Sequence, residues 1–163
     1  MTETAIRLLG GVLLALAGAL LGHGKKTELL RQKRCLEQLS SALSRMENEL
    51  AELQTPMPQL LAHLEDCRFF LLVSAGFGGE PLERLWQRAA DCQPIPQKDR
   101  ETLGRLGAVV GRYDAARQTA EITLARKELS ESAAALEREL TERGRHFAGL
   151  GAALGAMLAV ILF

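Results

Sequence analysis

The 163-residue sequence has no excess of charge of either sign and few cysteines, and each shortage excludes a class of protein. Its 20 Lys and Arg balance 20 Asp and Glu, so the chain lacks the basic face that non-specific nucleic-acid binding requires. Cys35, Cys67 and Cys92 are odd in number and contain no C-x-x-C pair, which argues against a disulfide framework and a zinc site. We therefore expect reduced cysteines in packing positions and no nucleic-acid partner.

Histidine is also sparse, and nothing around it suggests an active site. His23, His63 and His146 stand far apart, and the spacing brings no nucleophile grouping or pair of carboxylates together with them. Segment 63–67 holds a histidine, a cysteine and two carboxylates, but this spacing is more typical of a solvated helix face than of a tetrahedral metal site. Gly78-Gly79 lacks the Lys-Ser/Thr of a nucleotide-binding loop. We expect no enzyme, cofactor or metal.

Two apolar segments near the chain ends are the most prominent features that are present. Residues 8–22 and 147–163 carry no charged side chain, and we extend the first segment across Arg7 to 6–22. A helix as long as segment 147–163 covers about 25 Å, somewhat less than the ~30 Å hydrocarbon core of a bilayer. A buried helix of a soluble domain is rarely apolar on every face. We interpret both segments as transmembrane helices that bracket a domain at 25–146.

Basic residues flank both predicted spans on the side of this domain. Lys25 and Lys26 follow the first span, and Arg143 and Arg145 precede the second. Because positive residues are retained on the cytoplasmic side of a membrane, we expect the domain to face the cytoplasm. A cleaved secretory signal is the competing interpretation of the first span, and the absence of an A-x-A site after it disfavours that reading.

Small residues recur at four-residue intervals within the predicted spans. Gly18 and Gly22 lie in the first span, and Gly151 and Gly155 lie in the second. Such spacing lets helix backbones approach closely in lipid. We expect the spans to pack on each other, either within one chain or between copies.

The domain between the spans has helical periodicity interrupted by Pro and Gly. An apolar stripe over 36–53 predicts a long amphipathic helix that is continuous with the first span. Thr55-Pro56-Met57-Pro58 should end it, with Thr55 or a neighbour capping one second helix that runs to 75–79. Trp86, the single Trp, should be a core anchor. The pattern predicts an all-α bundle of about six helices.

The last joint of this bundle is expected near residues 106–114. Gly111 is a suitable stop for one helix, and Asp114 is a suitable N-cap for the next, because its carboxylate can accept the free N–H groups of the first turn. The helix that follows carries an apolar stripe over 122–140 and runs towards the second span. Gly144 is the one evident hinge on that path.

These features, in this order, resemble the stage III sporulation protein AB family of endospore-forming bacteria over nearly the full chain. The residues that carry the resemblance are segments 8–22, 55–58, 81–86, 106–111 and 147–163, together with Asp114 and Gln118. Met57 and Val110 replace leucines of the family pattern, and both replacements are conservative. The resemblance marks Gly107, Gly111, Asp114 and Gln118 as a structural joint.

The resemblance also implies a role. The soluble domain of the family is similar to the cytoplasmic helical domain of the F platform protein of type II secretion. The resemblance therefore implies that the chain is a platform component of the secretion-like channel between mother cell and forespore. It also implies a location in the mother-cell membrane around the forespore. The implied partners are the secretion-type ATPase of the same complex, which the protein couples to the membrane, and other channel subunits.

A second hypothesis stays open at this point. The chain could be a membrane-tethered scaffold outside any secretion system, self-associating as a homo-oligomer through the stripe at 36–53 as a coiled coil does. A stable monomeric domain disfavours this hypothesis, because the stripe is then internal core.

Overall fold

A computed structural model describes the backbone of residues 2–53 and 55–162 and the side chains of residues 24–51 and 55–142. The elements of this described part are helical, apart from one isolated bridge between Phe77 and Glu80. In chain order they are α1 (Thr2–Asn48), the π-helical η1 (Glu49–Leu53), α2 (Met57–His63), α3 (Arg68–Gly76), α4 (Leu82–Asp91), α5 (Gln97–Gly107) and α6 (Ala115–Leu162). The predicted all-α class is confirmed.

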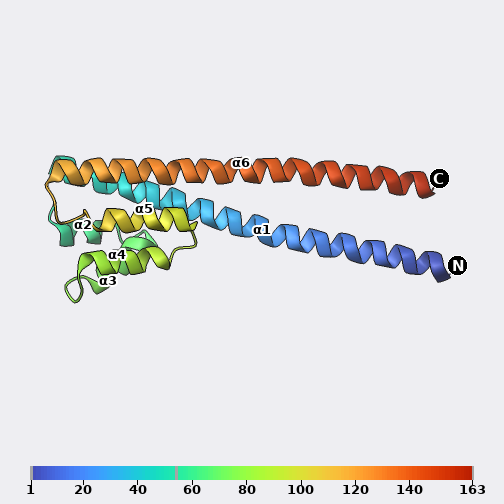
Figure 1. Cartoon of the computed structure of the whole chain (residues 1–163), viewed down its shortest axis with the longest axis horizontal. Helices are drawn as coiled ribbons and strands as arrows, with labels where there is room; N and C mark the ends of the chain where they lie inside the picture. Colours follow the sequence, from blue (N-terminus) through green and yellow to red (C-terminus); the bar gives the residue numbers. More distant parts are fainter. Residues whose placement is uncertain (1, 54, 163) are drawn as a thin grey trace.

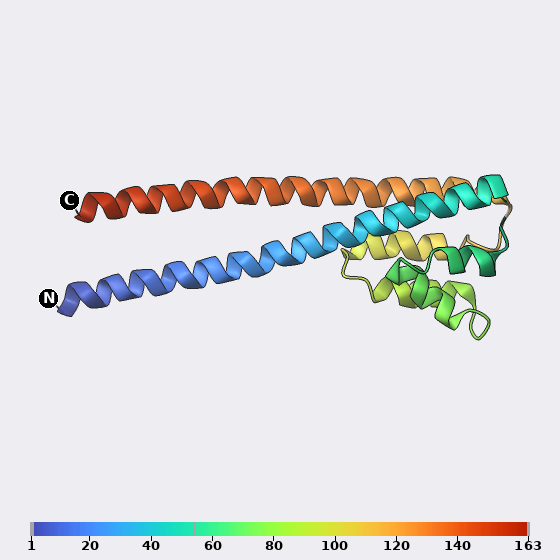
Figure 2. The same cartoon turned by 180° about the vertical axis from the view of Figure 1, so that it is seen from behind.

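Two long helices, α1 and α6, dominate the molecule (Figure 1). They have 47 and 48 residues, or about 70 Å each at ~1.5 Å per residue. The two helices run antiparallel beside each other, and their outer halves extend beyond the short helices to the same side (Figures 1 and 2). The backbone of α6 stays helical through Gly144, so the expected hinge is not a break in the helix.

The apolar stripe of α1 is buried within the single chain. Leu36, Leu43 and Met46 have no exposed surface, and they share one hydrophobic core with Ile122 and Leu129 of α6. Burial of this kind, rather than helix propensity, supplies most of the stability of such helices. The described part of the stripe, 36–50, is therefore internal core and presents no coiled-coil surface to another copy. This burial disfavours self-association through the stripe.

Polar contacts fix the register of α1 against α6. The Thr123 hydroxyl donates to Glu47 Oε1 at 2.7 Å, and Arg126 Nε lies 3.1 Å from Glu47 Oε2. Further along, Lys33 Nζ lies 3.5 Å from a carboxylate oxygen of Glu137. Because α1 and α6 are tied at two separated levels, sliding of one helix past the other breaks specific contacts.

The prediction that Thr55 or a neighbour caps the second helix is wrong. Pro56 occupies the N-cap of α2, and no side-chain cap hydrogen bond forms there. An N-cap side chain normally accepts from the second or third helical N–H, and the second position of α2 is Pro58, which has none. Thr55 lies one residue too early to serve.

The single second helix predicted over this region is in fact two helices. α2 ends at His63, and α3 begins at Arg68 after a turn closed by hydrogen bonds from Leu64 N–H to Leu61 C=O and from Cys67 N–H to Leu64 C=O. Asp66 within this turn accepts two hydrogen bonds of 2.8 Å from Arg45 of α1. No Pro or Gly marks the break, and the turn is accompanied by this contact with α1 and by burial of Leu64 and Cys67.

The predicted membrane spans fall on residues whose side chains the structure does not describe. Their backbone belongs to α1 and α6. Among the residues that are described, no helix has a stretch that is long and apolar enough to cross a membrane. The spans at 6–22 and 147–163, with Gly18, Gly22, Gly151 and Gly155, lie outside the described side chains and stay predictions.

Candidate functional site at the joint of α5 and α6

The turn between α5 and α6 is closed by one buried glutamine. Gly111 has a φ of 79°, a conformation that side chains other than glycine rarely adopt. Its backbone N–H donates to Gln118 Oε1 at 3.0 Å, and Gln118 Nε2 donates to the carbonyl of Tyr113. Gln118 is 8% exposed, whereas Gly111 and Tyr113 are exposed, so these bonds are partly shielded from water. One side chain of α6 therefore holds both ends of the turn that leads into it.

Asp114 provides the cap of α6. Its Oδ1 accepts the backbone N–H of Arg117 at 2.7 Å, and its carbonyl accepts the N–H of Gln118 at 3.0 Å. The first bond satisfies a donor that an uncapped helix leaves free. The Arg117 guanidinium also stacks on Tyr113, 3.9 Å from the ring centroid. The start of α6 is thus fixed by local contacts.

Gly107 has a different role, because it makes room for Trp86. A Cβ atom at position 107 would lie 2.6 Å from Trp86 Cγ, far inside van der Waals contact. Trp86 has no exposed surface and packs edge-to-face against Phe69 and Phe70, with ring centroids 5.1 Å and 5.6 Å away. Edge-to-face packing of this kind adds to the stability that burial provides. The last turn of α5 is therefore seated directly on the aromatic core.

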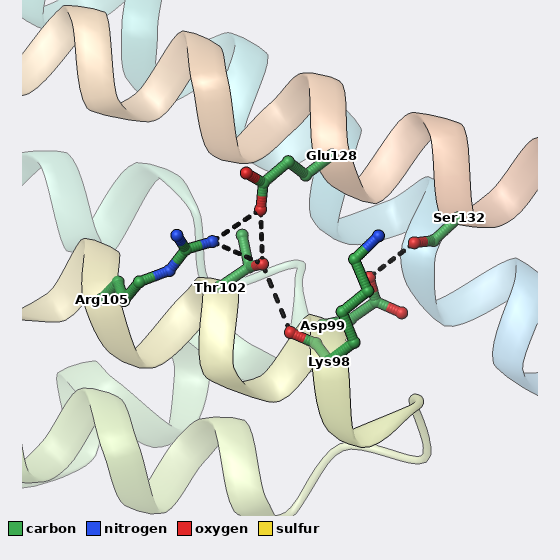
Figure 3. Close-up of polar contacts among 6 residues, drawn as sticks. All are labelled: Lys98, Asp99, Thr102, Arg105, Glu128 and Ser132. Atoms are coloured by element: carbon green, nitrogen blue, oxygen red, sulfur yellow. Dashed lines mark hydrogen bonds and ion pairs between the residues drawn. The ribbon is translucent and has the colours of Figure 1, made fainter.

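A polar contact joins the middle of α5 to α6 (Figure 3). Glu128 Oε2 of α6 accepts hydrogen bonds from the Thr102 hydroxyl at 2.6 Å and from Arg105 Nη2 at 2.8 Å. Thr102 is buried, whereas Arg105 is largely exposed. Hydrogen bonds to a charged carboxylate are stronger than those between neutral groups. The contact holds α5 and α6 in one register beyond the turn.

Asp99, one turn earlier in α5, makes a second contact of this kind. Its Oδ1 accepts the Ser132 hydroxyl at 2.7 Å, while Oδ2 is buried without a partner among the described residues (Figure 3). Burial raises the pKa of this carboxyl, and the bond from Ser132 offsets only part of that rise. A buried, half-satisfied carboxylate destabilises the folded chain when it is ionised.

Sequence reasoning missed these α5–α6 contacts. The sequence does contain two polar pairs at helical spacing. Asp99 and Thr102 lie three residues apart, and Glu128 and Ser132 lie four apart, so each pair shares one helix face. Neither segment contains a sequence feature that indicates packing of these two helix faces against each other.

The side chains of segment 63–67 do not converge. His63 Nδ1 lies 3.0 Å from Glu49, Asp66 is bound by Arg45, and Glu65 accepts the hydroxyl of Ser74 at 2.7 Å. Within the described part of the chain, no three His, Cys, Asp or Glu side chains are grouped closely enough to hold a metal ion.

The contacts at this site fix α5 and α6 relative to each other. Comparison with known proteins gives its context: the family model described as stage III sporulation protein AB matches residues 7–163. The chain belongs to this family. Its members take their name from sporulation, and we assign this protein a role in that process. The family predicted from the sequence motifs is thereby confirmed.

A solved structure shares the fold. It is titled "Stage III sporulation protein AB (SpoIIIAB)", and it superimposes with a TM-score of 0.61 over 68% of this chain and 97% of that one, at 22% sequence identity. A search among curated proteins found no match. The joint residues Gly107, Gly111, Asp114 and Gln118 all lie within the segment that the family model matches.

Proposed function

We propose that this sporulation protein is a non-catalytic platform component of the secretion-like channel between mother cell and forespore. In this proposal the helices at 6–22 and 147–163 anchor it in the mother-cell membrane around the forespore, and the helical domain faces the mother-cell cytoplasm. A secretion-type ATPase of the same complex binds the domain, which passes the motion of the ATPase to the channel subunits in the membrane.

The continuity of α1 and α6 is the observation that carries this proposal. Each helix runs from the core of the bundle into a segment predicted to cross the membrane, without an intervening loop. A continuous helix transmits a displacement along its axis, whereas a flexible linker absorbs it. A force on the bundle is therefore delivered to the membrane through two stiff connections.

The joint of α5 and α6 supports the same role. Gln118 and Asp114 fix the start of α6, Glu128 ties it to α5, and Glu47 and Lys33 connect α6 to α1. The short helices are thus bound to the two long ones at several levels. This arrangement favours movement of the domain as one body, which a coupling component requires.

An insertion between domain and membrane tests the proposal. A seven-residue Gly/Ser insertion after Glu142 should uncouple the bundle from the second span, whereas a seven-residue helix-forming insertion keeps the helix continuous and nearly preserves its phase. In a sporulating host that lacks the native copy, we expect heat-resistant spores to fall sharply with the flexible insertion and to be retained better with the helical one.

Two controls make this result interpretable. Membrane fractionation should show equal amounts of both insertion variants, and each should still co-purify with the ATPase. Equal spore counts for the two insertions would show that a stiff connection is unnecessary. Failure of the unmodified full chain to associate with the ATPase in membranes would overturn the platform proposal itself.

A further inference from the structure

Three arginines without carboxylate partners line one groove at the end of the bundle nearest the predicted spans. Arg31 and Arg34 belong to α1, and Arg68 is the first residue of α3. The groove has a volume of about 510 Å³ and also includes Gln93 and Pro94 from the loop between α4 and α5. That loop lies at the end of the bundle facing the outer halves of α1 and α6 (Figures 1 and 2).

Among the described arginines, Arg84, Arg100, Arg117 and Arg138 also form no ion pair, so Arg31, Arg34 and Arg68 are set apart by lining one groove together. Five other arginines of the described part each lie within an ion pair: Arg45 with Asp66, Arg88 with Glu80, Arg105 with Glu128, Arg112 with Glu83 and Arg126 with Glu47. In the same part of the chain, no ion pair forms at Arg31, Arg34 or Arg68, and all three are exposed. Their positive charge is left for a group from outside the chain.

Two of these arginines act electrostatically on the same side chain, Cys35, within the groove. Burial raises the pKa of the Cys35 thiol to about 11, and the positive charges of Arg68 and Arg31 both oppose that rise. Cys35 itself lines the groove. The α1 and α3 arginines therefore act on one small volume, although they stand far apart in the sequence.

Retention of positive charge beside a membrane span explains Lys25 and Lys26 but does not explain Arg68. Arg68 is distant in sequence from both predicted spans and comes to this groove through the fold. A folded cluster of guanidinium groups is suited to a phosphate group, which guanidinium binds through paired N–H donors.

We propose that this groove binds the phosphate of an anionic lipid headgroup. Arg31 lies roughly 14 Å along α1 from Gly22, the end of the first predicted span. Its side chain leans back towards the helix N-terminus, and the headgroup layer extends roughly 5–8 Å from the hydrocarbon core. An arginine in this position reaches the headgroup region, where the surface of an anionic leaflet attracts basic side chains.

The proposal rests on the membrane anchoring in the proposed function and specifies how the domain is seated. With the phosphate bound between α1 and α3, the end of the bundle is held to the lipid surface at a second point besides the spans. The domain then cannot swing freely about α1. Such a seat stiffens the connection that carries the motion of the ATPase.

Native mass spectrometry of the purified full chain, released from detergent, tests this inference. The probes are phosphatidylglycerol, the zwitterionic phosphatidylcholine, and inorganic phosphate. We expect preferential retention of phosphatidylglycerol. Because one basic side chain near a membrane surface is worth about fivefold in affinity, Arg31→Gln with Arg68→Gln should weaken retention about 25-fold. Arg84→Gln removes the same charge from an exposed residue of α4 outside the groove, and should change nothing.

Several results overturn the inference. Equal retention of the two lipids, or equal retention by the Arg31/Arg68 and Arg84 variants, excludes the headgroup site. Binding of inorganic phosphate that displaces phosphatidylglycerol assigns the groove to free phosphate. Unchanged lipid retention combined with lost binding of the ATPase by the Arg31/Arg68 variant assigns it to a protein. As a folding control, the circular dichroism signal of the Arg31/Arg68 variant must match that of the parent. If this variant loses the lipid preference but still inserts into membranes and binds the ATPase, the platform proposal stands.

Discussion

Gly107→Ala should destabilise the chain because it forces a methyl group into Trp86. The added Cβ would lie 2.6 Å from Trp86 Cγ and 2.7 Å from Trp86 Cβ. The indole cannot move away easily, because Phe69 and Phe70 pack against it and Trp86 has no exposed surface. Overpacking of a core typically costs about 1–3 kcal/mol. We expect a value near the upper end of this range, since the obstacle is a rigid ring.

Gly104→Ala is the matched control in the same helix. Its added Cβ would lie 2.4 Å from Gln87 Oε1, the far end of a flexible and exposed side chain that can rotate away. Alanine is favoured over glycine within a helix by about 1 kcal/mol. Gly104→Ala should therefore be neutral or stabilising, although the two glycines stand only three residues apart.

Thermal unfolding of the full chain in detergent, followed by circular dichroism and by fluorescence of the single Trp, gives both values. For a domain of this size, 1 kcal/mol corresponds to roughly 3–6 °C in Tm. Trp86→Phe combined with Gly107→Ala should recover part of the loss, because the smaller ring leaves room for the methyl group. Equal stability of the two alanine variants, or the absence of any coupling with Trp86, refutes the packing argument.

Three further predictions concern α5 and α6. Asp114→Ala should lower the free energy of unfolding by about 1 kcal/mol while Asp114→Asn retains most of the cap, and urea titration of both variants checks this. Gln118→Leu should lower the free energy of unfolding by about 1–2 kcal/mol, because the Gly111 N–H and the Tyr113 carbonyl in this exposed turn exchange their Gln118 bonds for water. Amide exchange at Gly111 should become faster, and unchanged exchange contradicts the bridge. Because the pKa of Asp99 is raised in the folded chain, the stability from its bound proton is present below about pH 4 and is lost as the pH rises. Asp99→Asn should thus gain on the parent as the pH increases from about 4, and a constant difference in urea midpoint contradicts this.

The sequence predicted correctly those features of the fold that depend on the pattern of neighbouring residues. The stripe over 36–50 is buried as its spacing of three and four residues requires, with α1 carrying it to Asn48 and the π-helical η1 carrying its last residues. The helix stop at Gly111 and the N-cap at Asp114 could be predicted for the same reason, because a positive φ and an N-cap depend on a few neighbouring residues.

Contacts between distant segments could not be predicted in this way. The break between α2 and α3 contains no Pro or Gly, and its turn packs Leu64 and Cys67 into the core while Asp66 contacts Arg45 of α1. The need for glycine at position 107 comes from Trp86 on another helix. The bond between Thr102 and Glu128 joins residues whose meeting depends on how α5 packs on α6. Each of these follows from tertiary packing, which single-sequence periodicity does not encode.

A platform component that binds a cytoplasmic ATPase requires its helical bundle on the cytoplasmic side of the membrane, and labelling of Cys92 measures on which side the bundle lies. Cys92 is exposed and so does not occupy the packing position expected from the sequence. Cys67 is buried, and burial raises the pKa of Cys35 to about 11, so Cys92 should react selectively with a maleimide. With the full chain in the plasma membrane of growing cells, a maleimide that cannot cross membranes should label Cys92 in inside-out vesicles and leave it unlabelled in spheroplasts. Labelling of Cys92 in intact spheroplasts would contradict a platform that faces the cytoplasm.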